Sequence, residues 1–82
     1  MPDPKDAAQA RLWAEAPPLG RYRHYKGGEY EVITHALKED TLEPLVIYRS
    51  LAKGTIWART FDDWSQEVEA QGQRVQRFEQ ID

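Results

Sequence analysis

Apolar and polar residues alternate along much of the chain from residue 20 onward, and this two-residue period predicts β-strands. The first strand is expected over residues 20–25, with Tyr22 and His24 on one face. Gly27-Gly28 follows, and glycine tolerates the positive φ angles of a tight turn. Alternation then resumes over about residues 29–38, so this part of the chain predicts a β-hairpin.

The second strand of this hairpin has a mixed pattern. The side chains expected to point inward are Tyr30, Val32 and Ala36, whereas the apolar residues Ile33 and Leu37 fall on the opposite face of the strand. Such a break in the period predicts either a β-bulge or a strand that is covered on both faces. Closure of the sheet into a barrel would account for both.

Three further strands are expected, over residues 45–48, 55–59 and about 74–81. Thr60-x-x-Asp63 is a capping pattern, and it predicts a short helix that ends at Gly72. About five strands and one short helix in so small a domain indicate a mainly β, strongly bent antiparallel barrel, because an open sheet would leave two edges unprotected.

Residues 1–18 have a different character and are expected to form a helical or disordered extension, with the barrel domain over residues 19–82. Asp3 can cap a helix, Pro4 suits its first position, and Pro17-Pro18 ends it. The apolar stripe of this helix is thin, so it is expected either to dock through Trp13 or to fray; the stripe comprises Ala8, Leu12 and Trp13.

The composition sets bounds on the function. With 82 residues the chain forms one domain at most, and without cysteine it has neither a disulfide framework nor a thiolate metal site. No apolar run approaches the roughly 20 residues that span a bilayer, and the N-terminus lacks the pattern of a signal peptide. We therefore expect a cytoplasmic protein with no membrane partner and no cofactor.

Three segments resemble the bacterial family called domain of unknown function 1653. They are GRYRHYKGGEYEV at 20–32, TLEPLVIYR at 41–49 and WAR at 57–59. The resemblance extends over residues 19 to about 80 and implies an SH3-like barrel, but no activity. The sequence departs from the family pattern at Thr60, where proline is usual, and in the acidic segment that follows.

The predicted first hairpin carries cations beside aromatic rings. Arg21, Arg23 and Lys26 give residues 17–28 a net charge of +3, and Tyr22 and Tyr25 lie among them. Cations that hold phosphates and rings that stack on bases are the components of single-strand recognition, so RNA is one alternative partner. The overall net charge of −3 argues against a general polyanion binder.

The preferred interpretation is a binding module for a peptide, a protein or a small polar ligand. An aromatic and basic groove with a polar rim suits such ligands. Arg59 is expected either to clamp a ligand or to pair with Glu31 or Glu43. The candidate ligand-binding residues are Arg23, His24, Tyr25, Lys26, Glu43, Tyr48, Trp57 and Arg59.

Catalysis is the least favoured hypothesis. His24 and His35 are the only side chains that titrate near neutrality when unperturbed, and no nucleophile elbow, phosphate loop or metal-binding pattern accompanies them. A small hydrolase that uses His24 with Glu43 or Tyr48 remains as an alternative, but no catalytic or metal-ligating residue is assigned.

Overall fold

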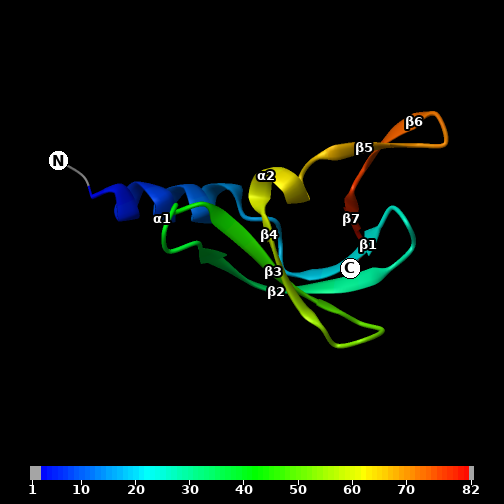
Figure 1. The fold of residues 1–82 in the computed structure, drawn as a ribbon, viewed down its shortest axis with the longest axis horizontal. Coiled ribbons are helices and arrows are strands. Elements are labelled where there is room, and N and C mark those ends of the chain that lie inside the picture. The colour runs from blue at the N-terminus through cyan, green and yellow to red at the C-terminus, as the bar shows by residue number, and fades with distance from the viewer. Residues whose placement is uncertain (1–2, 82) are drawn as a thin grey trace.

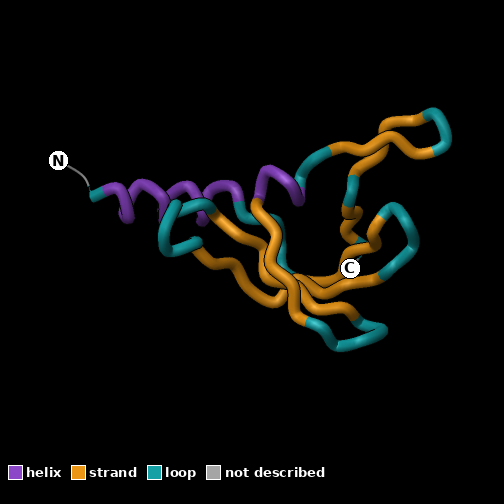
Figure 2. Tube along the Cα trace, viewed as in Figure 1, coloured by secondary structure: helices purple, strands orange, loops and turns teal. Residues whose placement is uncertain are grey.

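The computed structural model describes residues 3–81 and shows a mainly β protein with a helix at its N-terminal end (Figures 1 and 2). The elements in chain order are α1 (Pro4–Glu15), β1 (Gly20–His24), β2 (Glu29–Leu37), β3 (Pro44–Ser50), β4 (Ile56–Thr60), α2 (Phe61–Trp64), β5 (Glu67–Ala70), β6 (Gln73–Gln76) and β7 (Phe78–Gln80).

The strands form one five-stranded antiparallel sheet and one separate hairpin. The sheet has the order β4-β3-β2-β1-β7, and within residues 3–81 β5 pairs only with β6. The predicted mainly β fold with antiparallel strands is therefore confirmed. The expected closure is not seen, because no strand pairing within residues 3–81 joins β4 to β7. The segment between α2 and β7 pairs with itself and leaves β4 at an open edge.

The predicted irregularity in β2 is a change of register against β3. The pairing shifts between Val32 and Thr34, so one residue is left over on β2. That residue is Ile33, which is 39% exposed, whereas Val32 before it is fully buried. The bulge places His35 on the same face as Val46. This shift explains why the apolar residues before and after it fall on different faces by simple alternation.

Aromatic rings dominate the core. Trp64 of α2 stacks on Phe78 of β7 with ring centroids 3.8 Å apart and an interplanar angle of 5°. Tyr48 meets both rings edge-on, and Tyr22 meets Trp64 in the same way. Trp64 and Phe61 are buried, while Tyr30 packs against the core and is partly buried. The buried set is Tyr22, Val32, Val46, Tyr48, Phe61, Trp64 and Phe78.

The short helix starts as predicted but ends much earlier. The Thr60 hydroxyl accepts a hydrogen bond from the backbone N–H of Asp63 at 3.1 Å, which caps α2. The prediction that Gly72 ends this helix is wrong, because Gly72 forms the β5–β6 turn together with Gln71. Both residues have positive φ, +51° for Gln71 and +77° for Gly72, as two-residue hairpin turns require. Val68, expected on the helix, lies opposite Val75 in the hairpin.

The N-terminal helix is present and rests on the sheet. Asp3 caps it by accepting a hydrogen bond from the Lys5 N–H at 2.8 Å, as predicted. Leu12 and Ala16 pack against the core, but Trp13 is 71% exposed, so the expectation that Trp13 docks the helix is wrong. The division of the chain at residue 18 stays a prediction. No helix in the described part of the chain is long and apolar enough to cross a membrane.

Replacement of Thr60 by alanine tests the cap of α2. Thr60→Ala should lower the free energy of unfolding by about 1 kcal/mol, because the Asp63 N–H loses its acceptor. Urea unfolding followed by tryptophan fluorescence measures this change. Thr55→Ala, at an exposed loop position, is the matched control and should change stability by less than about 0.5 kcal/mol. Equal effects of the two substitutions would contradict the capping role.

Candidate ligand-binding site

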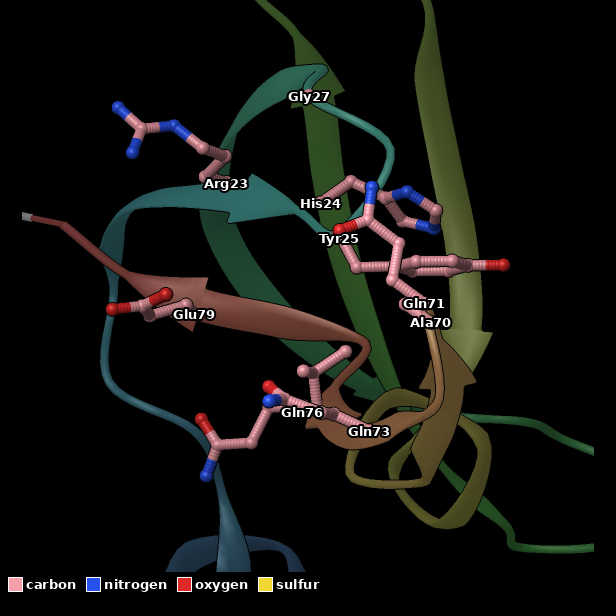
Figure 3. A pocket seen from close by; sticks show the side chains of 10 residues that line it. Arg23, His24, Tyr25, Gly27, Ala70, Gln71, Gln73, Gln76 and Glu79 are labelled. Carbon is pink, nitrogen blue, oxygen red and sulfur yellow. The ribbon is translucent and has the colours of Figure 1, made fainter.

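A cavity of about 460 Å³ lies between the β1–β2 turn, β7 and the β5–β6 hairpin, and we call it the hairpin cavity (Figure 3). Its walls come from segments that are far apart in the sequence. The lining residues are Arg23, His24, Tyr25, Gly27, Ala70, Gln71, Gln73, Val75, Gln76 and Glu79.

Backbone hydrogen bonds hold the two sides of this cavity together. The Tyr25 N–H donates to the Arg77 carbonyl at 3.0 Å, and the Arg77 N–H donates to the Gln66 carbonyl at 3.3 Å. These bonds tie the β1–β2 turn to the base of the β5–β6 hairpin. The turn itself is closed by a 2.7 Å bond from the Gly27 N–H to the His24 carbonyl, with Gly27 at a φ of +104°.

The rings of His24 and Tyr25 lie side by side at the start of the β1–β2 turn. The Tyr25 side chain is 37% exposed, and its ring centroid lies 4.6 Å from that of His24. The Lys26 ammonium lies 5.7 Å from the centre of the Tyr25 ring, within the range of a cation–π contact. His24 also meets Phe78 edge-on at 5.0 Å, which connects this surface to the core.

The other wall is built from amides and small apolar groups. Ala70, Gln73 and Val75 share one face of the hairpin by its register, and Gln71 occupies its turn. Figure 3 shows the Gln71 side chain reaching toward His24 and Tyr25. This wall was not predicted from the sequence, because residues 61–72 were interpreted as one helix. The alternation of residues 67–70 and 73–76 around a Gln-Gly turn was the signal that would have revealed it.

His24 is held in its neutral form. The backbone N–H of Lys26 donates to His24 Nδ1 at 3.1 Å, so in the neutral ring Nε2 carries the hydrogen. Burial is the main cause that lowers the pKa of His24, and the positive charges of Arg59, Arg77 and Lys26 lower it further. At neutral pH the imidazole therefore offers a donor rather than a positive charge.

Arg59 belongs to a structural cluster on the core face. Its Nε donates to the Tyr48 hydroxyl at 3.3 Å, and its Nη1 lies 2.7 Å from Asp63 Oδ2. Its guanidinium also lies 5.6 Å from the centre of the Phe78 ring. Arg59 thus pairs with Asp63 rather than with either expected partner, since Glu31 pairs with Arg49.

The remaining candidate residues do not join the hairpin cavity. Tyr48 is only 5% exposed, in the core. Trp57 is 53% exposed and lines a separate cavity of about 260 Å³ that also includes Tyr30. Glu43 lies in the loop before β3, where its backbone N–H and a carboxylate oxygen both contact the Thr41 hydroxyl. The candidate residues expected to line one groove therefore lie in separate places. Of these candidates, only Arg23, His24 and Tyr25 line the hairpin cavity, and Lys26 lies beside them.

The charges near the cavity are largely balanced. Arg23 is opposite Glu79 in the β1–β7 register and lies 3.8 Å from Glu29. Tyr22, one of the two rings expected to stack on bases, is buried with its hydroxyl bonded to the Pro18 carbonyl. Within residues 3–81, no group of three or more His, Cys, Asp or Glu side chains could hold a metal ion. The hairpin cavity is thus polar and aromatic rather than strongly basic.

The protonation of His24 gives a testable pH dependence. NMR titration of its ring should give a pKa below the ordinary value of about 6.5. Because the unfolded chain then binds a proton more readily than the folded one, the free energy of unfolding should fall as the pH drops below about 6.5, and this loss should level off below the folded pKa. Urea unfolding at several pH values should show a smaller dependence in His24→Gln. An NMR pKa at or above the ordinary value would contradict the burial of this imidazole.

Comparison with known proteins places this fold in a family. A crystal structure of a DUF1653 protein from Bordetella bronchiseptica matches with a TM-score of 0.75 at 27% sequence identity, over 82% of this chain and 90% of that one. Comparison with curated proteins finds no match. The family model described as protein of unknown function (DUF1653) matches residues 20–80, from the start of β1 to the end of β7. The chain therefore belongs to the DUF1653 family, as its resemblance to that family implied.

Proposed function

We propose that this domain is a binding module that holds a small, uncharged, polar ligand with a planar ring in the hairpin cavity. The main support for this proposal is that the exposed ring of Tyr25, the neutral imidazole of His24 and several glutamine amides line one cavity. These groups come from the β1–β2 turn and the β5–β6 hairpin, which the Tyr25 and Arg77 backbones join.

The chemistry of the walls favours a planar polar ring. The Tyr25 ring supplies a surface for stacking, and aromatic contacts of this kind contribute about 0.5–1.5 kcal/mol beyond the area they bury. The amides of Gln71, Gln73 and Gln76 provide both donors and acceptors, and His24 Nε2 provides a donor. A ligand that carries both donors and acceptors at its edge can satisfy these groups together.

The charge balance argues against a strongly charged ligand. Arg23 and Glu79 lie opposite each other at the rim, and His24 is neutral. A dianionic ligand would gain from Arg23 but would meet Glu79 nearby. The volume of about 460 Å³ falls within the range of roughly 300–1,000 Å³ that small-molecule sites occupy.

The β5–β6 hairpin gives the cavity a wall that can adjust. Neither strand of this hairpin pairs with the five-stranded sheet, and the hairpin extends away from it (Figure 1). Segments with few packing contacts open and close at low free-energy cost. The hairpin can therefore adjust to a ligand while the core stays packed.

Titration of the ¹⁵N-labelled protein with millimolar adenosine, cytidine and N-acetyl-tyrosine amide tests the proposal. At least one probe should shift the amide signals of residues 23–27 and 70–76, because these residues line the cavity. Tyr25→Leu should weaken that binding by about tenfold, as expected for the loss of one stacking contact. Trp13→Leu, at an exposed ring on α1, is the matched control and should bind like the wild type.

The same titration with a short single-stranded RNA distinguishes the alternative function, nucleic-acid binding, from the proposed one. Nucleic-acid binding should shift the β1–β2 hairpin signals in a manner that weakens steeply with salt, whereas binding of an uncharged ligand should not depend on salt. Absence of any shift at the cavity with all probes would reject the proposed ligand class.

A further inference from the structure

One edge of the sheet presents backbone groups that have no neighbouring strand. The β4 strand pairs with β3 on one side, and no second strand of the described chain, residues 3–81, pairs with its other side. The Ser50 N–H donates to the Thr55 carbonyl at 2.9 Å, which fixes the alternation of hydrogen bonds along this pair. Trp57 and Arg59 thus bond toward β3, while the N–H and C=O groups of Ile56 and Ala58 point outward.

The side chains along this edge do not protect it from pairing. Ile56 is 52% exposed and Trp57 is 53% exposed, and residues 54–58 carry no charge. Natural edge strands are ordinarily guarded by lysine, proline, bulges or very short length. The opposite edge follows that rule, because β7 has three residues with Glu79 at its centre. The β4 edge is therefore suited to receive another strand.

We propose that a second copy of this chain pairs with β4, so that two sheets join as one through an antiparallel β4–β4 contact. The two-fold axis passes between the two Trp57 residues. This register places Ile56 of each copy opposite Ala58 of the other. It joins the outward backbone groups of both residues in hydrogen-bonded pairs and leaves none of them unmatched.

The same register places the two Trp57 rings together. Trp57 lies opposite its own copy in a non-hydrogen-bonded pair, where side chains of neighbouring strands come closest. By its pairing with Tyr48, Trp57 projects from the core face of the sheet, while Ile56 projects from the other face. Each exposed apolar side chain of this edge thus gains a neighbour across the contact.

Charges at the ends of the contact are complementary. The register brings Lys53, in the β3–β4 turn of one copy, level with Phe61 at the start of α2 in the other. The first turn of α2 carries Asp62 and Asp63. Asp63 is paired with Arg59, whereas the Asp62 side chain lies 3.3 Å from Arg11 but stays 85% exposed and can also meet Lys53. Two-fold symmetry repeats this pair at both ends. A second copy supplies this matching through its symmetry, whereas an unrelated extended peptide would need an acidic and a basic residue at the same spacing.

The contact involves short strands, so the dimer is expected to be weak. Stable interfaces bury roughly 1,200–2,000 Å² in total, and five-residue edges approach only the lower end of this range. Sedimentation equilibrium at tens to hundreds of micromolar protein should show a weight-average mass that rises from 9.5 kDa toward twice that value. The paired tryptophans should add an exciton couplet to the far-UV circular dichroism over the same range.

A charge exchange at residue 57 tests the symmetry. Trp57→Glu and Trp57→Lys should each remain monomeric, because the register places two like charges together. An equimolar mixture of the two variants should dimerise again, because the carboxylate introduced in one chain then meets the ammonium introduced at the same position in the other. Trp13→Glu, at the exposed ring of α1, is the matched control and should associate like the wild type.

Three outcomes would overturn the proposal. They are a wild type that remains monomeric at about one millimolar, single charge variants that associate like the wild type, and a mixture that fails to restore the dimer. Amide NMR spectra of both Trp57 variants verify that the fold is kept. Trp57 lies outside the hairpin cavity, so failure of this proposal and failure of ligand binding are separate results.

Discussion

The stack of Trp64 on Phe78 is the contact on which the arrangement of the other elements depends. It joins α2 to β7 at a centroid distance of 3.8 Å, and Tyr48, from the middle of the sheet, meets both rings. A domain of 82 residues buries little aliphatic volume, so large rings supply most of its apolar contact area. Replacement of either ring would remove the packing that brings the C-terminal strand to β1.

This contact also explains why a hairpin and a cavity exist. Trp64 and Phe78 are separated by 13 residues, but their rings touch, so the intervening chain must leave the core and return. It does so as β5 and β6, which satisfy each other's backbone hydrogen bonds and leave the sheet unextended. The base of that excursion meets the β1–β2 turn through Tyr25 and Arg77, and the space between them is the hairpin cavity.

Local signals in the sequence predicted most of the fold but only part of the site. The cap at Asp3, the Gly27 turn and the break at Ile33 depend on nearby residues and were predicted correctly. The hairpin at residues 67–76 was missed because the capping pattern at Thr60-x-x-Asp63, followed by Gly72, favoured a longer helix. The cavity could not be predicted, since its two walls meet only through tertiary contacts. The ion pair of Arg59 with Asp63 was missed for a different reason: the two residues are only four apart, but Asp63 was considered only as part of the cap of α2, and both expected partners of Arg59 lie in other segments.

The open sheet gives the two sides of the molecule different physical properties. A barrel closed between β4 and β7 would have satisfied the β4 edge, and the backbone groups of Ile56 and Ala58 would have had partners within the chain. Because the chain between α2 and β7 pairs with itself, the side near β5 and β6 gains a polar cavity. The β4 side keeps outward backbone groups beside exposed Ile56 and Trp57. One choice of strand pairing thus produces both surfaces, and strand addition at the β4 edge leaves the cavity open because β4 contributes no lining residue to it.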